Sequence, residues 1–208
     1  MTTPHPTLTL IEQRISANRF DASHRLADAE IERLVELATR APTAYNLQNW
    51  RFIAVRTPAA KARLRAVAQD QAKVEEAAVC FIVCGVLADP QSLAERLQPF
   101  VGAGFMPAGM AQGWLQAASQ QYASAQAVRD EALRSASLAS MTLMHAAQAL
   151  GLASCAMTGF DAEGVASTFG LAPDEVPVML VTVGRAAAGN WPQKPRRPLA
   201  QVLELELA

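Results

Sequence analysis

Polar and aromatic side chains that could recognise a small molecule are concentrated between Ala41 and Phe52. Asn46, Gln48 and Asn49 carry amides, which donate and accept hydrogen bonds at once and so suit the edge of a heteroaromatic ring. The stretch is too polar for a buried core and joins a predicted helix to an apolar run. A helix-to-strand loop with turn-forming amides explains the same residues, and both interpretations remain open at this point.

Two short basic clusters, far apart in the chain, have the chemistry to hold an anion. Arg14 lies two residues before Ser16, and a guanidinium with a neighbouring hydroxyl suits a phosphate group. Near the other end, Lys194 and Arg196 lie between prolines. Prolines stiffen the segment and so reduce the conformational entropy that is lost when it binds an anion. Solvated surface charge is the alternative explanation for each cluster.

A third set of polar residues borders predicted strands. Gln71 and Lys73 come shortly before the apolar run 79–84, where they either line a pocket or form the solvated end of a helix. Thr158 and Gly159 follow an apolar segment and belong to a turn. These residues alone do not distinguish a binding site from a surface.

The cysteines and the histidine in the apolar parts of the chain are expected to be structural. Cys80 and Cys84 are four residues apart, so they share one face of a strand and should pack in the core. With Cys155 they show no paired spacing for a disulfide framework or a metal site, and a cytoplasmic location follows as the default. His145, among small and apolar neighbours, should be a hydrogen-bonded core residue.

Length and composition narrow the class of protein. The chain has 208 residues, 51% of them hydrophobic, and a formal net charge of -1. This balance favours neither a disordered chain nor an electrostatic nucleic-acid binder, so a small-molecule substrate is expected. The longest apolar run, 77–88, is shorter than the roughly 20 residues that span a bilayer, so no membrane association is expected. Residues 1–9 lack the pattern of a secretory signal and should form a loose tail.

Hydrophobic periodicity and end signals predict the elements that position these residues. They are a helix from Asp28 to Pro42 with Asp28 as N-cap, a strand over 52–55, a helix from Thr57 through Val67, a strand over 79–84, a helix over 130–150, a strand that leads into a turn within 154–161, a helix over 163–169 and a strand over 176–184.

Two of the intervening segments have special character. Residues 89–127 are interrupted by glycines and carry aromatics, which fits a lid that covers a substrate or an irregular connector. The predicted helix over 130–150 is apolar nearly all round, so it must be buried in the domain centre or between subunits.

Taken in order, these pieces resemble the flavin-dependent nitroreductase family over nearly the whole chain, least so between 89 and 130. The resemblance is carried by Arg14-x-Ser16, the loop 41–52, Gln71-x-Lys73-Val74, Gly159-Phe160-Asp161 and Lys194-x-Arg196. It implies a single domain over residues 1–208 with an α+β fold, a mostly antiparallel central sheet wrapped by helices, and an intertwined homodimer with two FMN sites at its interface.

The resemblance also implies roles for individual residues. The positions that hold the FMN phosphate correspond to Arg14, Ser16, Lys194 and Arg196. The loop that reaches the flavin from the second subunit corresponds to Pro42, Thr43, Ala44 and Asn46. Gln71 and Lys73 match contacts to the pyrimidine edge, and Thr158 and Gly159 match the turn whose backbone N–H faces flavin N5.

Four positions depart from the family pattern. Asn18 lies near the flavin where many relatives have Lys or Arg, and Asp70 where an uncharged residue is usual. One cation fewer and one anion more should lower the flavin potential. Thr158 stands where Glu is common, and Asn49 stands where proline often follows the glutamine and should loosen the loop.

The activity that the resemblance implies is a ping-pong oxidoreductase. NADPH or NADH would reduce FMN and leave, and a nitroaromatic, quinone or similar flat electron acceptor would take its place. No catalytic side chain is expected, because the flavin performs the redox step. The sequence G-x-G-x-x-G is absent, which supports one shared site for donor and acceptor. Specialised flavin chemistry on the same fold (dehalogenation, dehydrogenation or flavin fragmentation) and a low-turnover flavin-binding or storage protein are the alternatives.

Overall fold

The computed structural model describes residues 5–89 and 92–206, and its centre is an antiparallel sheet. In the described residues the strand order is β1-β2-β4-β3, with β1 Trp50–Val55, β2 Val79–Val86, β4 Glu175–Gly184 and β3 Ala153–Met157. Ile82 of β2 lies opposite Ile53 of β1 on one side and Leu180 of β4 on the other. The predicted α+β fold with a mostly antiparallel sheet is therefore confirmed.

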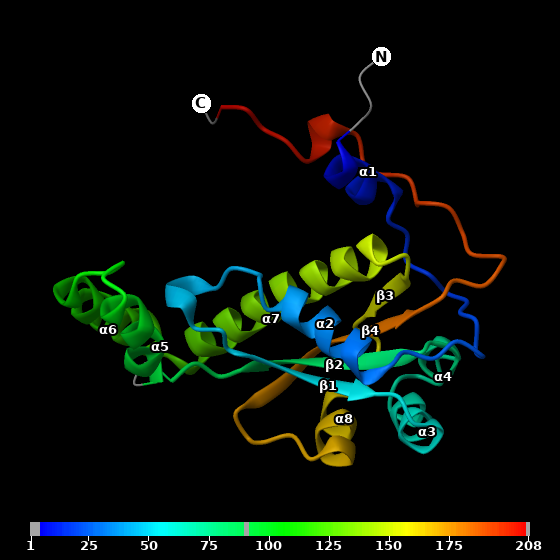
Figure 1. The fold of residues 1–208 in the computed structure, drawn as a ribbon, viewed down its shortest axis with the longest axis horizontal. Coiled ribbons are helices and arrows are strands. Elements are labelled where there is room, and N and C mark those ends of the chain that lie inside the picture. Colours follow the sequence, from blue (N-terminus) through cyan, green and yellow to red (C-terminus); the bar gives the residue numbers. More distant parts are fainter. Residues whose placement is uncertain (1–4, 90–91, 207–208) are drawn as a thin grey trace.

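Helices cover both faces of this sheet (Figure 1). On one face lie α2 (Asp28–Ala38) and α7 (Ala125–Ala149), and on the other lie α3 (Pro58–Ala66), α4 (Lys73–Glu76) and α8 (Ala162–Phe169). The alternation of side chains along β2 supplies both layers. Phe81 belongs to the core cluster of α2 and α7, whereas its neighbour Ile82 belongs to that of α3 and α8.

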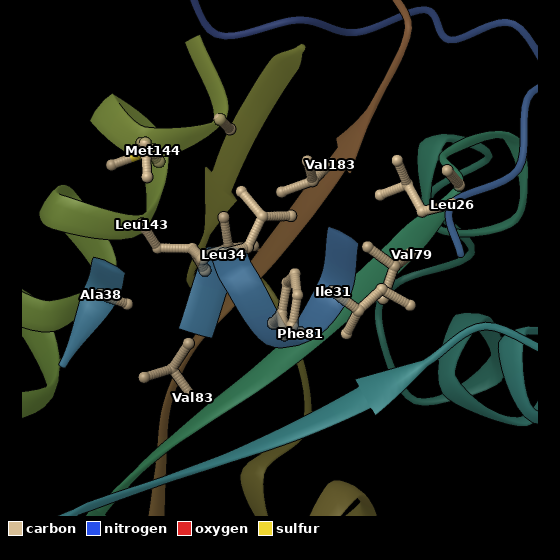
Figure 2. Close-up of a cluster of buried hydrophobic side chains, with 14 of the residues drawn as sticks. Leu26, Ile31, Leu34, Ala38, Val79, Phe81, Val83, Leu143, Met144 and Val183 are labelled. Carbon is tan, nitrogen blue, oxygen red and sulfur yellow. The ribbon is translucent and has the colours of Figure 1, made fainter. Parts of the chain in front are cut away.

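Figure 2 shows how the first of these clusters is built. Leu34 of α2 and Leu143 of α7 lie over Phe81 at the centre of the sheet, and all three are fully buried. Close packing of large apolar side chains at this level is the main stabilising contribution to such a fold. Cys80 and Cys84 lie on the opposite face, fully buried as predicted.

The segment 89–127 forms two helices, α5 (Leu93–Gly102) and α6 (Ala108–Gln121), beyond one end of the sheet (Figure 1). They surround a third apolar cluster that includes Leu47 and Tyr122. Of the glycines expected to interrupt this segment, Gly104 lies in the short connection between the helices, whereas Gly102 belongs to α5 and Gly109 and Gly113 lie within α6. Residues 90 and 91 of this segment lie outside the described residues.

The first and last described helices project away from the sheet in Figure 1, and Gln193 Nε2 joins the segments next to them by donating to Arg14 O. These helices are α1 (Pro6–Gln13) and the short 3-10 helix η3 (Leu199–Gln201). The expected loose tail is therefore wrong for residues 6–9, because Pro6 starts a helix and His5 Nδ1 accepts a hydrogen bond from Thr7 N at 3.3 Å. Residues 1–4 of that tail are outside the described residues.

Three predicted helix ends differ from the structure. Helix α2 ends at Ala38, ahead of Pro42, and its N-cap is Ala27, whose N–H donates to Glu30 at 2.8 Å. Helix α7 begins at Ala125, earlier than predicted, because Ser124 Oγ accepts from Ala127 N at 3.2 Å and caps it. The Thr57 cap of α3 is confirmed. No helix among the described residues is both long and apolar enough to cross a membrane.

Candidate functional site

The two basic clusters, nearly 180 residues apart in sequence, meet at one cavity. This cavity of about 100 Å³ is lined by Arg14, Ile15, Ser16, Trp191, Pro192, Gln193, Lys194 and Arg196. All four residues that the sequence predicts for phosphate binding are among them. Within the described part of the chain, none of the three cations forms an ion pair with a carboxylate. Their uncompensated positive charge suits a phosphate dianion.

Hydrogen bonds between the two segments hold this cavity in shape. Asn190 Oδ1 accepts from the backbone N–H groups of Asn18 at 2.7 Å and Arg19 at 3.0 Å, and Asn190 Nδ2 donates to Arg19 O at 2.9 Å. Gln193 Nε2 donates to Arg14 O at 3.1 Å. Neither Asn190 nor Gln193 could be predicted from the sequence, because a side chain that binds a distant backbone leaves no periodic signal.

The N-terminal segment is also tied to the sheet. Ser16 forms a bridge with Ser154 of β3, and Ala17 N donates to Ser154 O at 3.0 Å. Arg14 is half-buried at this position, whereas Lys194 and Arg196 are exposed. Lys194 Nζ lies 5.7 Å from the centre of the Trp191 ring, within the range of a weak cation-π attraction.

Lys73 lies next to this segment, at the start of α4. Its Nζ donates to Asn18 Oδ1 at 3.3 Å and lies 3.5 Å from the Sγ of Cys155. Lys73 and Asn18, which the resemblance places near the flavin, are therefore in direct contact. The side-chain carbonyl of Asn18 therefore gives the ammonium a neutral acceptor.

Gln71 binds protein backbone with its side-chain amide. Its Nε2 donates to Gly159 O at 3.0 Å and to Ala68 O at 3.1 Å. Gln71 thus ties the turn before α4 to the Thr158–Gly159 turn, and both predicted elements lie together. At Gly159 a Cβ atom would come within 2.9 Å of Gln69 Oε1, so a larger residue there would require the Gln69 side chain to move.

The turn before α4 has an uncommon backbone. Gln69 and Asp70 both have a φ of 54°, in the left-handed region that side-chain-bearing residues seldom adopt. Arg65 holds this turn with its Nε 2.7 Å from Asp70 Oδ1 and its Nη1 2.5 Å from Glu75 Oε2. Because Asp70 is paired and largely exposed, its charge is offset, and the expected effect of an added anion near the flavin is weakened.

The loop at residues 41–49 lies at the other end of the molecule, beside α5 and α6 (Figure 1). Its 3-10 turn η1 (Ala44–Asn46) has φ values of 52° at Tyr45 and 58° at Asn46. Thr43 Oγ1 accepts from Gln48 N at 3.0 Å. Strained backbone of this kind persists where the surroundings hold it, and it is common in ligand-binding loops.

Aromatic contacts fasten the loop to α6. The Tyr45 ring lies edge-on to Trp114, with centroids 5.7 Å apart, and to Tyr122, with centroids 6.2 Å apart. The Tyr45 hydroxyl also hydrogen-bonds Gln121 Oε1 at 2.9 Å. Asn49 is 2% exposed and its Nδ2 donates to Val86 O at 3.0 Å. The expectation that Asn49 loosens the loop is therefore wrong.

The predicted site residues thus form two separate groups in one chain. Along β3 and the start of α4 lie Arg14, Ser16, Asn18, Gln71, Lys73, Thr158, Gly159, Lys194 and Arg196. Pro42, Thr43, Ala44 and Asn46 lie near α5 and α6 instead. One chain by itself does not bring the two groups together.

The remaining titratable candidates do not form a reactive centre. Burial raises the pKa of the Cys80 and Cys84 thiols to about 12, so both are inert packing groups near neutral pH. His145 Nε2 is buried and has no hydrogen-bond partner in the described structure, contrary to expectation, and burial followed by the charge of Arg14 lowers its pKa. Among the described residues no cluster of His, Cys, Asp or Glu could hold a metal.

Comparison with known proteins identifies relatives that match along most of their length. A model of the Nitroreductase family matches residues 11–185. The Bacillus subtilis protein YodC, whose name assigns it provisionally to the NAD(P)H nitroreductases, is 34% identical over 196 residues, which cover 94% of this chain and 96% of that protein. The NADH dehydrogenase of Thermus thermophilus is 33% identical over 181 residues, which cover 83% of each chain. A solved structure from Exiguobacterium sibiricum, described provisionally as a nitroreductase in complex with FMN, is 27% identical, covers 99% of both chains and has a TM-score of 0.88.

Proposed function

Because this chain belongs to the nitroreductase family, we propose that it is an FMN-dependent oxidoreductase that passes electrons from NADPH or NADH to a small, flat acceptor. Nitroaromatics and quinones are the acceptor classes that suit such a site. Donor and acceptor would use the same site in turn, as in a ping-pong mechanism. We place the enzyme in the cytoplasm, since its three buried cysteines are free thiols.

The observation that carries the proposal is the convergence of unpaired cations on one cavity. Arg14, Lys194 and Arg196 offer guanidinium and ammonium groups, and Ser16 adds a hydroxyl donor. These donors fit the phosphate of FMN better than they fit a metal or an uncharged ligand. The related structure that is described with FMN supports the same cofactor.

The chain's residues would bind, orient and polarise the cofactor. When bound, FMN supplies the redox chemistry, with hydride accepted at its N5 atom. Lys73 would stabilise negative charge on the ring, because its ammonium lies beside Asn18 with no carboxylate paired to it in the described structure. Gln71 fixes the turn at Gly159 whose backbone would face the reacting atom.

We further propose that the site is completed by a second copy of the chain. In a homodimer, residues 42–46 of one protomer would reach the cavity of its partner, which explains why the two groups of predicted residues lie apart in one chain. The ends of the chain offer an apolar surface for this contact. Exposed side chains there include Leu8, Ile11, Leu199, Val202 and Leu203.

Helices α5 and α6 are the candidate lid. They lie beside the loop that would enter the partner's site. Exposed apolar side chains there are Phe100 of α5, Met110 of α6 and Phe105 in the connection between them. Acceptor specificity would then depend on this helical pair.

Absorption spectroscopy of the purified protein tests the proposal. We expect a yellow protein whose flavin bands bleach when NADPH or NADH is added without oxygen and recover with a nitroaromatic or a quinone. Bound flavin that neither nicotinamide bleaches would favour specialised flavin chemistry or storage. A colourless protein that takes up no added FMN would overturn the proposal.

A further inference from the structure

A second cluster of cations surrounds a different cavity. This cavity of about 220 Å³ is lined by Arg25, Arg56, Pro58, Lys61 and Glu75. It lies where the segment before α2, the end of β1, the start of α3 and the helix α4 come together. It shares no lining residue with the cavity of Arg14 and Lys194.

Lys61 is the buried member of this cluster, with only 5% of its surface exposed. Its Nζ donates to the backbone oxygens of Ala77 and of Glu75, the latter at 3.2 Å. An ammonium has three N–H donors, so one donor remains for a ligand. No carboxylate among the described residues forms an ion pair with Lys61, and a buried charge without a paired anion is unfavourable.

Other groups around the cavity add positive potential. In the described structure Arg25 donates hydrogen bonds through Nη1, to the backbone oxygens of Ala22 and His24. Burial lowers the pKa of Lys61 most, and the nearby charge of Arg25 lowers that pKa further. Pro58 is the first residue of α3, so the positive end of the helix dipole borders the cavity. Two cations that repel each other across an open space are stabilised by an anion between them.

The acidic groups near the cavity already have partners. Glu75 Oε2 lies 2.5 Å from Arg65 Nη1 and so belongs to the ion pairs that join α3 to α4. Asp28 forms an ion pair with Arg56 at the cavity's exposed edge. The excess of cations is therefore concentrated at Lys61 and Arg25.

We propose that this cavity is a binding site for a small oxyanion, held by Lys61 and Arg25 with Arg56 at its mouth. Phosphate, sulfate and the phosphoryl group of a nucleotide share the required chemistry of several acceptor oxygens around a compact negative charge. The cavity has room for such a group, because a water molecule occupies only about 30 Å³ of the liquid. Its occupation would fasten α4, the helix that begins with Lys73, through the ammonium of Lys61.

The experiment measures oxyanion binding to the FMN-saturated protein, in which FMN blocks the other basic cavity. Inorganic phosphate, sulfate and 5′-AMP are titrated against chloride at constant ionic strength, and calorimetry and the melting temperature are recorded. We expect saturable binding of phosphate and a melting temperature that rises with its concentration. Binding of 5′-AMP but not of phosphate would identify a nucleotide as the source of the phosphoryl group.

Variants locate the site. Arg25→Gln should weaken phosphate binding roughly tenfold, the effect of one charge-assisted hydrogen bond, and Lys61→Met should abolish it. Arg33→Gln is the matched control, because Arg33 is an exposed arginine on α2 whose partner is Glu36. If Lys61→Met does not fold, the phosphate affinities of Arg25→Gln and Arg33→Gln are compared, and a loss confined to Arg25→Gln supports the site.

Two outcomes overturn the proposal. One is an equal phosphate affinity in the wild type and Arg25→Gln. The other is phosphate binding that is lost in a Lys194→Gln, Arg196→Gln variant, since it would then belong to the first cavity. This second variant also separates the oxyanion proposal from the proposed function, because it removes the FMN phosphate contacts and leaves Lys61 and Arg25 untouched.

Discussion

The ammonium of Lys73 donates a hydrogen bond to the side-chain carbonyl of Asn18 at 3.3 Å. This contact joins the N-terminal segment to the start of α4, beside the phosphate cavity. Asn18 thus orients the lysine with a neutral acceptor. The local charge is then one unit less positive than with Lys or Arg at position 18.

We predict that Asn18→Lys raises the midpoint potential of the bound flavin. A second cation stabilises the more negative, reduced cofactor, and a gain of about 1.4 kcal/mol corresponds to roughly 30 mV for a two-electron couple. A redox titration measures the shift. Asn18→Gln is the control, because it retains a carbonyl acceptor and adds no charge. An unmoved potential in Asn18→Lys would count against a role for this position.

We predict that Lys194→Gln with Arg196→Gln weakens FMN binding at least a hundredfold. Each lost charge-assisted hydrogen bond costs about 1.5–3 kcal/mol, and every 1.4 kcal/mol is about tenfold in affinity. Fluorescence titration gives the dissociation constants. Arg197→Gln should leave them unchanged, because Arg197 does not line the cavity and bonds to Gln201. Equal losses in both variants would show a general charge effect.

Asn190 should matter for cofactor binding without touching the phosphate cavity. Its amide holds the backbone of Asn18 and Arg19, so Asn190→Ala releases the N-terminal half of the site. We expect about tenfold weaker FMN binding, the equivalent of one or two neutral hydrogen bonds. Asn190→Asp keeps the acceptor and loses the donors, so its FMN affinity should lie between those of the wild type and Asn190→Ala. An unchanged FMN affinity in Asn190→Ala would show that the hydrogen bonds of Ser154 and Gln193 suffice to hold residues 14–19 in place.

The sheet contains an ion pair whose strength should depend on pH. Arg51 Nη1 contacts both oxygens of Glu175, at 2.9 and 2.7 Å, and the Glu175 side chain is 8% exposed. Burial raises the pKa of Glu175, but hydrogen bonds from Arg51 and from the Ala172 N–H outweigh it and leave the pKa below its ordinary value of 4.5. A lowered pKa stabilises the fold above pH 4.5, and this contribution is lost as the pH falls through the folded-state pKa.

We therefore predict that Arg51→Met destabilises the protein by about 3 kcal/mol at neutral pH, because it leaves a buried carboxylate unpaired. The loss should shrink below pH 4.5, where Glu175 becomes protonated in the variant. Urea denaturation at neutral and acidic pH measures it. Arg51→Met with Glu175→Gln should recover part of the stability. A loss of the same size at both pH values would show that the arginine acts through packing alone.

Much of the architecture could be predicted because its signals are local. The run of small and branched apolar residues at 79–84 predicts a buried strand, and the Thr57-Pro58 pair predicts a helix start. The meeting of Arg14 with Lys194 could be proposed only through the resemblance to the family, in which both positions hold one phosphate. Side-chain chemistry alone does not join the two clusters, because solvated surface charge explains each of them equally well.

The missed features depend on pairings between distant residues. Asn190 looks like a turn residue after Gly189, and nothing local indicates that its amide reaches residues 18 and 19. Asp70 looks like an added anion until Arg65 is found beside it. Asn49 looks like a loop residue, yet it binds the end of β2. Each depends on three-dimensional proximity that periodicity does not encode.

The separation of residues 42–46 from the phosphate cavity in one chain leads to a complementation test. Asn46→Gly removes the loop amide and keeps a residue that tolerates the φ of 58°, and Lys194→Gln with Arg196→Gln removes the phosphate contacts. In a homodimer of either variant both sites are defective. In a mixed dimer, one site combines both defects and the other is intact. We therefore expect mixed dimers, purified through two different tags, to bind FMN with native affinity at about half of their sites. Mixed dimers that bind no better than their parents would show that each protomer builds its site alone.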